Sequence, residues 1–84
     1  MQLDILTPEK RLFSGEVDSV TLSGTMGLFT LLPNHAPMIS SLRSNGEVSY
    51  LRGSNRETVV IGGGFVEVRK NRVTVCAEQQ TSNP

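Results

Sequence analysis

Hydrophobic and polar residues alternate along most of the chain, which is the pattern that half-buried β-strands produce. In EVDSVTLSG, for example, Val20 and Leu22 alternate with serine and threonine. Similar alternation predicts strands within residues 2–6, 16–24, 46–53, 65–69 and 72–78. The segment ETVVIGG at 57–63 is instead a short apolar run, which indicates a strand buried on both faces. No stretch shows the i, i+3, i+4, i+7 spacing of an amphipathic helix.

Turn-forming residues recur between these segments. They lie at SGE (14–16), SNG (44–46), GSNR (53–56) and RKNR (69–72), and each predicts a tight reversal. RKNR joins two alternating segments and therefore predicts a β-hairpin. The three glycines at 62–64 lead into another strand rather than a helix, so they indicate a bulge or corner and not a phosphate-binding loop. Short strands about ten residues apart are typical of an antiparallel sandwich or barrel.

The composition fits a single small domain. The chain has 84 residues, and we expect 1–78 to form the domain and the polar segment 79–84 to form a tail. Eight basic residues balance eight acidic residues, and this argues against nucleic-acid binding, which needs a surplus of cations. The single cysteine, Cys76, cannot form an internal disulfide, and the chain has neither a long apolar run nor a signal-like start. These features favour a soluble domain in a reducing, cytosolic compartment.

His35 is the only histidine, and it lies between Pro33 and Pro37 in the segment LPNHAPMISSL. Ser40 and Ser41 follow it, but no spacing identifies a catalytic triad. One histidine and one distant cysteine do not make a zinc site, and no pair of carboxylates has a spacing that indicates acid–base catalysis. We therefore expect no catalytic residue, metal or cofactor, and we interpret His35 as part of an interface or a structural turn.

The connection at residues 24–33 is unusually apolar for a turn, because its tip reads Met26, Gly27, Leu28, Phe29. An exposed apolar loop indicates a contact surface. The alternative is that Leu28 and Phe29 fold back onto the core. The sequence leaves both interpretations open.

Several of these elements together resemble a known family. The chain shows Phe-Ser-Gly at 13–15 and then Gly-x-x-Gly at 24–27, which leads into Pro-x-His-Ala-Pro at 33–37. Last comes Gly-Gly-φ-x-Glu-Val-x-x-Asn-x-Val-Thr-Val at 63–75, where φ is apolar. This combination, in register from residue 3 to about residue 78, resembles the N-terminal β-sandwich of the ε subunit of bacterial F-type ATP synthase.

The resemblance implies an all-β fold, a ten-stranded antiparallel β-sandwich of two sheets. It also implies a non-catalytic central-stalk (rotor) subunit that links the γ subunit to the c-ring for coupled proton transport and ATP synthesis. Such a subunit is a peripheral protein on the cytoplasmic side of the bacterial inner membrane, as part of F1, without insertion into the bilayer.

By position, the resemblance assigns Met26, Gly27, Leu28 and Phe29 to contact with the polar loops of the c-ring. The residues that it places along γ are His35, Ala36, Met38, Ser40 and Leu42. Two positions depart from the family, which often has a charged or polar residue in place of Leu28 and glycine in place of Thr30. We therefore expect a more hydrophobic ring contact and a stiffer loop.

Many family members continue into a two-helix C-terminal domain that can inhibit ATP hydrolysis and in some cases binds ATP. This sequence stops at Pro84, which fits either a natural short form or a truncation, and we expect it to bind no nucleotide. Two other classes remain as alternatives. One is a small enzyme that uses His35 as a base, and the other is a small β-barrel that binds an oligonucleotide or saccharide through aromatic stacking.

Overall fold

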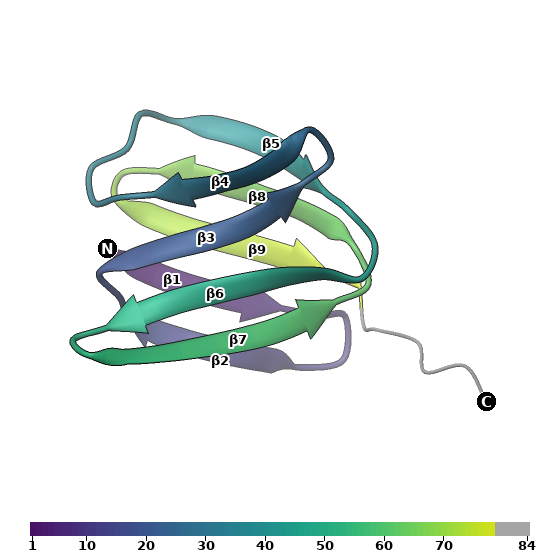
Figure 1. Cartoon of the computed structure of the whole chain (residues 1–84), viewed down its shortest axis with the longest axis horizontal. Coiled ribbons are helices and arrows are strands. Elements are labelled where there is room, and N and C mark those ends of the chain that lie inside the picture. Colours follow the sequence, from purple (N-terminus) through teal and green to yellow (C-terminus); the bar gives the residue numbers. More distant parts are fainter. Residues whose placement is uncertain (79–84) are drawn as a thin grey trace.

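The structure, a computed structural model, describes residues 1–78, which form nine β-strands and no helix (Figure 1). The strands are β1 (Gln2–Leu6), β2 (Arg11–Glu16), β3 (Ser19–Gly24), β4 (Gly27–Leu31), β5 (Met38–Leu42), β6 (Gly46–Arg52), β7 (Asn55–Ile61), β8 (Gly64–Arg69) and β9 (Arg72–Ala77). The predicted all-β class is confirmed. The tail expected at 79–84 lies outside the described residues.

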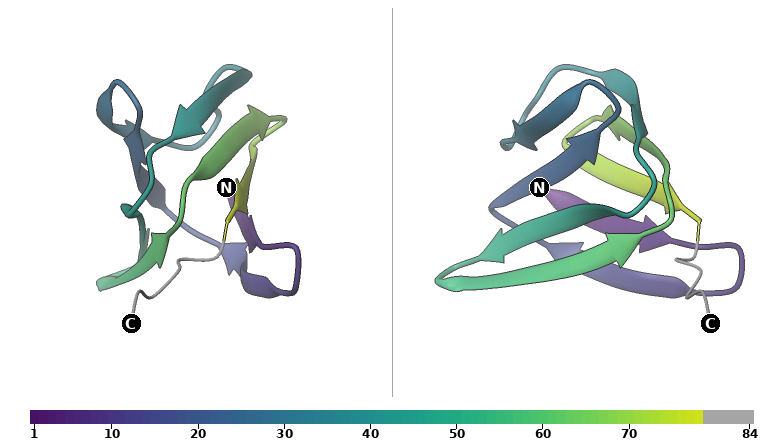
Figure 2. Two further views of the ribbon diagram at one scale, coloured as in Figure 1. Left: turned by 90° about the vertical axis from the view of Figure 1, so that its right-hand side faces the viewer. Right: turned by 45° about the vertical axis from the view of Figure 1, so that its right-hand side comes forward.

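The strands form one hydrogen-bonded sheet that folds over on itself. Their order is β2-β1-β9-β8-β5-β3-β6-β7, and β4 pairs with β3 beside this path. Strands β5 and β3 are joined by a single pair, Gly24 with Leu42, so the sheet divides there into two layers. The back layer is β2-β1-β9-β8-β5 and the front layer is β4-β3-β6-β7, and the two views in Figure 2 show them facing each other.

This architecture differs from the expected one in two respects. The described residues form nine strands rather than ten, and one neighbouring pair, β1 with β9, is parallel rather than antiparallel. The parallel pair joins the first and last strands, with Leu3 opposite Val73 and Ile5 opposite Val75. Parallel neighbours need a long connection between them, and here the whole of the rest of the domain provides it.

The core lies between the two layers and comes from the inward positions of the alternating strands. Leu3, Ile5, Val20 and Leu22 are all fully buried, as the alternation predicted. Within residues 1–78, the buried hydrophobic residues are Met1, Leu3, Ile5, Val17, Val20, Leu22, Leu31, Leu42, Val48, Tyr50, Ile61, Val66, Val68, Val73, Val75 and Ala77. Thr74 and Cys76 alternate with the last three and are only half-buried, so they mark the outer face of β9.

Two local predictions were wrong. The strand at 57–63 is not buried on both faces, because β7 is an edge strand that pairs only with β6. Most of it is exposed, including Val60 at 41%; Ile61 is buried in the core and Val59 packs against it. The segment at 14–16 is not a turn but the end of β2, where Gly15 lies opposite Leu3 of β1. Periodicity alone does not show how many neighbours a strand has.

Aromatic packing closes the open side of the sandwich, where the edge strands β2 and β7 lie one behind the other (Figure 1). The ring of Phe13 from β2 lies 4.2 Å from that of Tyr50 from β6, with an interplanar angle of 32°. The guanidinium of Arg52 lies 5.5 Å from the centre of the Phe13 ring, at cation–π distance. This one tilted aromatic pair and its cation cover the core where no strand-to-strand hydrogen bonds join the two layers.

Three of the four predicted reversals are present, those at 44–46, 53–56 and 69–72. The β8–β9 hairpin turns at Lys70 and Asn71, whose φ angles of 50° and 58° are those of a type I′ turn. The β7–β8 connection is a corner, as the glycines predicted, with φ of 106° at Gly63 and 135° at Gly64. At Gly64 a side chain is excluded, because a Cβ there would collide with the carbonyl oxygen of Cys76.

We expect Gly64→Ala to lower the free energy of unfolding by about 2–4 kcal/mol, since it combines an unfavourable φ with a backbone collision. Gly53→Ala is the matched control, because Gly53 also has a positive φ, 62°, but a Cβ there would meet nothing within 4 Å. The control loses about 1 kcal/mol. Urea denaturation measures both values, and equal losses would contradict the assigned corner geometry.

Candidate interaction surfaces

The β3–β4 hairpin projects an apolar tip from one end of the molecule. Gly24 pairs with Gly27 across a two-residue turn, and the φ of Gly27 is 127°, a value that favours glycine. Met26 in the turn is 99% exposed, and Leu28 on β4 is 74% exposed. Phe29 points the other way and packs against the core. The structure therefore leaves Leu28 exposed and folds only Phe29 back onto the core, because neighbouring residues of a strand face opposite sides.

The backbone at the root of this hairpin is bound to β5 and to the residue after it. The N–H of Thr25 donates to the carbonyl oxygen of Ser41 at 3.2 Å, and the N–H of Arg43 donates to that of Ser23 at 3.0 Å. Between Asp18 and Arg43 the sequence contains no aspartate, glutamate, lysine or arginine. The hairpin and β5 therefore present an uncharged surface on a firmly held backbone.

Strand β5 places the three of its residues expected along γ, Met38, Ser40 and Leu42, on its inner face. Leu42 is buried, and Met38 packs against the core from the same side, so the side chains at even positions point inward. Ser40 is half-buried between them. Ile39 points outward and is 70% exposed. Sequence reasoning missed Ile39, although the alternation fixed by a buried Leu42 would have placed it on the outside.

His35 lies in the exposed loop between β4 and β5 and has Ala36 beside it. Its Nδ1 lies 2.7 Å from the carbonyl oxygen of Ala36, which makes Nδ1–H the donor. The loop is held on the β8–β9 turn, because the N–H of Asn34 donates to Oδ1 of Asn71 at 2.8 Å. In this arrangement the imidazole braces the loop while the rest of the ring faces outward.

Within residues 1–78, no group of three or more His, Cys, Asp or Glu side chains could hold a metal ion.

The outer face of the back layer carries a second exposed apolar surface. Phe65 on β8 is 46% exposed, and it lies opposite Cys76 on β9, which in turn lies opposite Leu6 on β1. A shallow groove of about 370 Å³ runs along these residues and includes Pro8. A larger groove of about 610 Å³ is lined by Ile39 and by the hairpin residues Arg69 and Lys70, among others. We call this outer face of β5, β8, β9 and β1 the back surface.

A charged cluster bounds the back surface on β1, β2 and β9. The carboxylate of Asp4 accepts hydrogen bonds from Oγ of Ser14 at 2.6 Å, from Nη1 of Arg72 at 3.0 Å and from Nε2 of Gln2 at 3.3 Å. The Ser14 hydroxyl, above all, holds the pKa of Asp4 below its usual value of 3.8, against the opposing effect of partial burial. The cluster thus links three strands through one carboxylate.

We expect the stabilisation from Asp4 to depend on pH in the acid range. Because its pKa is lowered by folding, the contribution is present above the usual value of 3.8 and is lost as the pH falls through the lower pKa of the folded chain. The difference in unfolding free energy between the wild type and Asp4→Asn should therefore shrink as the pH falls below 3.8. Urea midpoints across this range measure the difference. The Ser14→Ala variant should raise the pKa of Asp4 in an NMR titration, and an unmoved pKa would contradict the assigned cause.

A second prediction tests the two faces of β5. Leu42→Ser should lower the free energy of unfolding by about 2–4 kcal/mol, because it removes a buried side chain and leaves a cavity. Ile39→Ser, the matched exposed variant, should change it by less than about 0.5 kcal/mol. Thermal or urea unfolding of the two variants gives the comparison. A large loss at Ile39 together with a small loss at Leu42 would reverse the orientation of the strand.

Within the described residues 1–78, no helix is long and apolar enough to cross a membrane.

Residues 1–82 match the model of a protein family described as ATP synthase, Delta/Epsilon chain, beta-sandwich domain. The chain is 42% identical over 77 residues to the ATP synthase epsilon chain of Chlorobaculum tepidum, and the match covers 92% of this chain and 88% of that one. It is 36% identical over 78 residues to the epsilon chain of Leptospira borgpetersenii, with coverage of 93% and 61%.

Solved structures show the same fold at low sequence identity. The chain matches a chain of the mitochondrial ATP synthase central stalk and c-ring of Tetrahymena thermophila with a TM-score of 0.78 and 12% identity, over 93% of this chain and 63% of that one. A chain of the Euglena gracilis mitochondrial ATP synthase matches with a TM-score of 0.81 and 20% identity, over 89% and 48%. The chain spans between about half and two thirds of the length of most of the curated relatives that it matches. On the family model and the Chlorobaculum match, this chain belongs to the family of ATP synthase delta/epsilon-chain β-sandwich domains.

Proposed function

We propose that the chain is a non-catalytic central-stalk subunit of an F-type ATP synthase, and that it links the γ subunit to the c-ring. The observation that carries the proposal is the set of exposed large apolar side chains, above all Met26 at 99%, Leu28 at 74% and Ile39 at 70%. Large apolar residues that remain exposed on a small domain indicate contact surfaces. Membership of the delta/epsilon β-sandwich family supports the identity of the partners.

The γ subunit is held by the back surface and the loop before it. His35 and Ala36 are exposed in this loop, and Ile39 continues the surface onto β5. Met38, Ser40 and Leu42 contribute from the inner face, where they fix the position of the strand beneath the contact. Arg69, Lys70 and Glu67 also line the Ile39 groove, so charged side chains of both signs border it. An apolar centre with a charged rim is the usual anatomy of a protein–protein interface.

The c-ring is contacted by the tip of the β3–β4 hairpin. Met26, Gly27 and Leu28 form the contact, and Phe29 anchors the hairpin to the core from the other side. In this role the subunit transmits torque, which needs stiffness and no chemistry. A close-packed sandwich is suited to that work, because its interior has low compressibility. The chain acts on the cytoplasmic side of the bacterial membrane as a peripheral part of F1, and it binds no nucleotide.

The stacking alternative is not favoured. Of the three phenylalanines and one tyrosine, Tyr50 is buried, Phe13 packs on Tyr50, and Phe29 packs against the core. Only Phe65 is exposed enough to stack on a base or a sugar ring. A stacking platform for single strands or saccharides uses several exposed aromatic rings.

Co-purification with γ tests the proposal. The wild-type chain should form a stable complex with co-expressed γ, and Ile39→Asp should weaken it by about tenfold or more, because it places a charge at the centre of the contact. Thr58→Asp is the matched control, since Thr58 is exposed on β7, in the other layer, and should leave binding unchanged. Failure of the wild type to bind γ would overturn the proposed function. Wild-type binding by Ile39→Asp would overturn the assignment of the back surface.

A further inference from the structure

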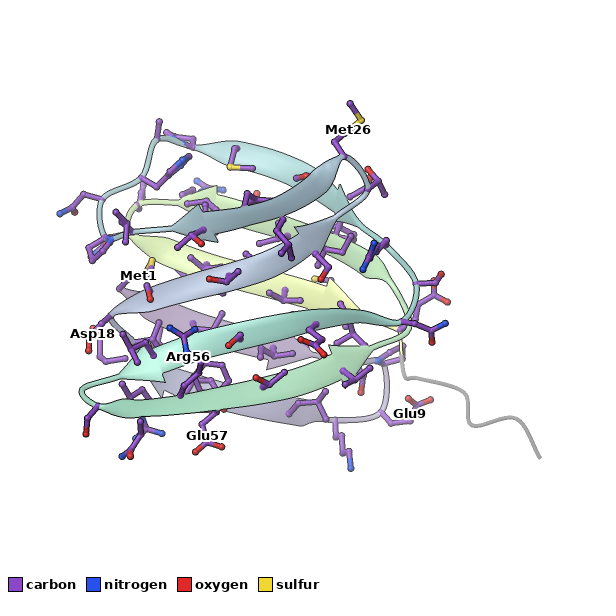
Figure 3. The ribbon with its side chains drawn as sticks, in the orientation of Figure 1. Met1, Glu9, Asp18, Met26, Arg56 and Glu57 are labelled. Atoms are coloured by element: carbon purple, nitrogen blue, oxygen red, sulfur yellow. The ribbon has the colours of Figure 1, made fainter. Side chains whose placement is uncertain are left out.

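The three methionines of the chain differ sharply in their surroundings. Met26 is 99% exposed, and Figure 3 shows its side chain pointing away from the hairpin into solvent. Met1 is 8% exposed, and its amino group is held by the carboxylate of Glu16 at 3.1 Å. Met38 is half-buried and packs against the core. Only one of the three sulfur atoms therefore lies on a side chain that is open on all sides.

The exposed methionine sits where a change in the side chain would leave the fold intact. Met26 makes no contribution to the core cluster, and Gly27 rather than Met26 carries the unusual φ of the turn. The hairpin root is held by backbone bonds from Thr25 to Ser41 and from Arg43 to Ser23. A polar group added at the tip therefore changes the chemistry of the surface without removing any bond that holds the hairpin.

We propose that Met26 is an oxidation-sensitive contact residue, which hydroperoxides convert to the sulfoxide and which then weakens docking of the hairpin. The selectivity for Met26 follows from the structure alone, whereas the weaker docking rests on the proposed function. In the reaction, the thioether sulfur attacks the peroxide and its O–O bond breaks. One oxygen is transferred to sulfur to form the S=O bond, and the other leaves as water or, from an organic peroxide, as the alcohol. The sulfur loses two electrons and the peroxide gains them.

The sulfoxide is expected to weaken docking because the tip is apolar and uncharged. No charged residue lies between Asp18 and Arg43, so the contact made by Met26 and Leu28 depends on the burial of apolar area. Oxidation replaces a flexible apolar side chain by a polar one. The sulfoxide oxygen is hydrated in the free chain, and docking would remove this water at a cost in free energy. The same exposure leaves the sulfoxide open to reductases, so the modification is reversible.

The first experiment follows the oxidation itself in the folded 84-residue chain. The chain is treated with dilute hydrogen peroxide, and peptide mapping by mass spectrometry gives the rate at each methionine. Met26 should be oxidised several-fold faster than Met38, and Met1 should be the slowest. In guanidinium chloride the three rates should converge, because the unfolded chain protects none of them. Oxidation of Met38 or Met1 as fast as Met26 in the folded chain would overturn the selectivity.

The second experiment measures docking on purified c-ring in detergent. Oxidation of the wild-type chain should lower its affinity about tenfold, which corresponds to about 1.4 kcal/mol. The Met26→Leu chain keeps an apolar tip and should bind equally well before and after peroxide treatment, whereas Met26→Gln should bind as weakly as the oxidised wild type. Unchanged binding by the oxidised wild type would overturn the contact role of Met26. Failure of the untreated wild type to bind the c-ring would overturn the proposed ring contact, while the order of oxidation rates would stand on its own.

Discussion

Burial of one face of every strand against a single shared core is the constraint on which the rest of this domain depends. A domain of this size has only one layer of side chains between its two sheet layers, so every inward position is needed. That requirement fixes which side chains point inward, and the side-chain period of two then fixes which ones point outward. Because Leu42 must be inside, Ile39 must be outside, and the back surface follows from the core rather than from any separate design.

The sequence predicted the elements whose pattern is local and failed where the answer depended on neighbours. The strands with clear alternation, such as those around Leu3 and Val73, were found because each has one buried and one open face. The β8–β9 turn was found because Lys70 and Asn71 are polar residues between two alternating runs. Strand β7 was misjudged because its apolar run was taken as a sign of burial, whereas its position at the sheet edge leaves residues such as Val60 open to solvent. The parallel pairing of β1 with β9 joins the two ends of the domain, and no local pattern indicates it.

The candidate contact residues show the same division. The hairpin tip was identified from its apolar residues, and the structure separates an exposed Leu28 from an inward Phe29, a split that alternation would also have given. On β5, the residues taken from the family resemblance were alternate positions on the inner face. The exposed Ile39 was overlooked because resemblance assigns a segment, whereas the direction of each side chain comes from the register of its strand. Phe65 was also overlooked, although alternation with the buried Val66 places it on the outer face of β8.

The joint between the two sheet layers connects the two proposed contact surfaces. The Gly24–Leu42 pair lies at the root of the hairpin and at the end of β5, and backbone hydrogen bonds from Thr25 and Arg43 flank it. A force applied at the hairpin tip therefore has a path to β5 through backbone hydrogen bonds, besides the path through the core side chains that Phe29 contacts. Backbone hydrogen bonds in a sheet have fixed lengths and directions, so this route deforms less than a path through rotatable side chains. In the proposed function, with γ on one surface and the c-ring on the other, this joint gives a direct backbone connection between the two surfaces.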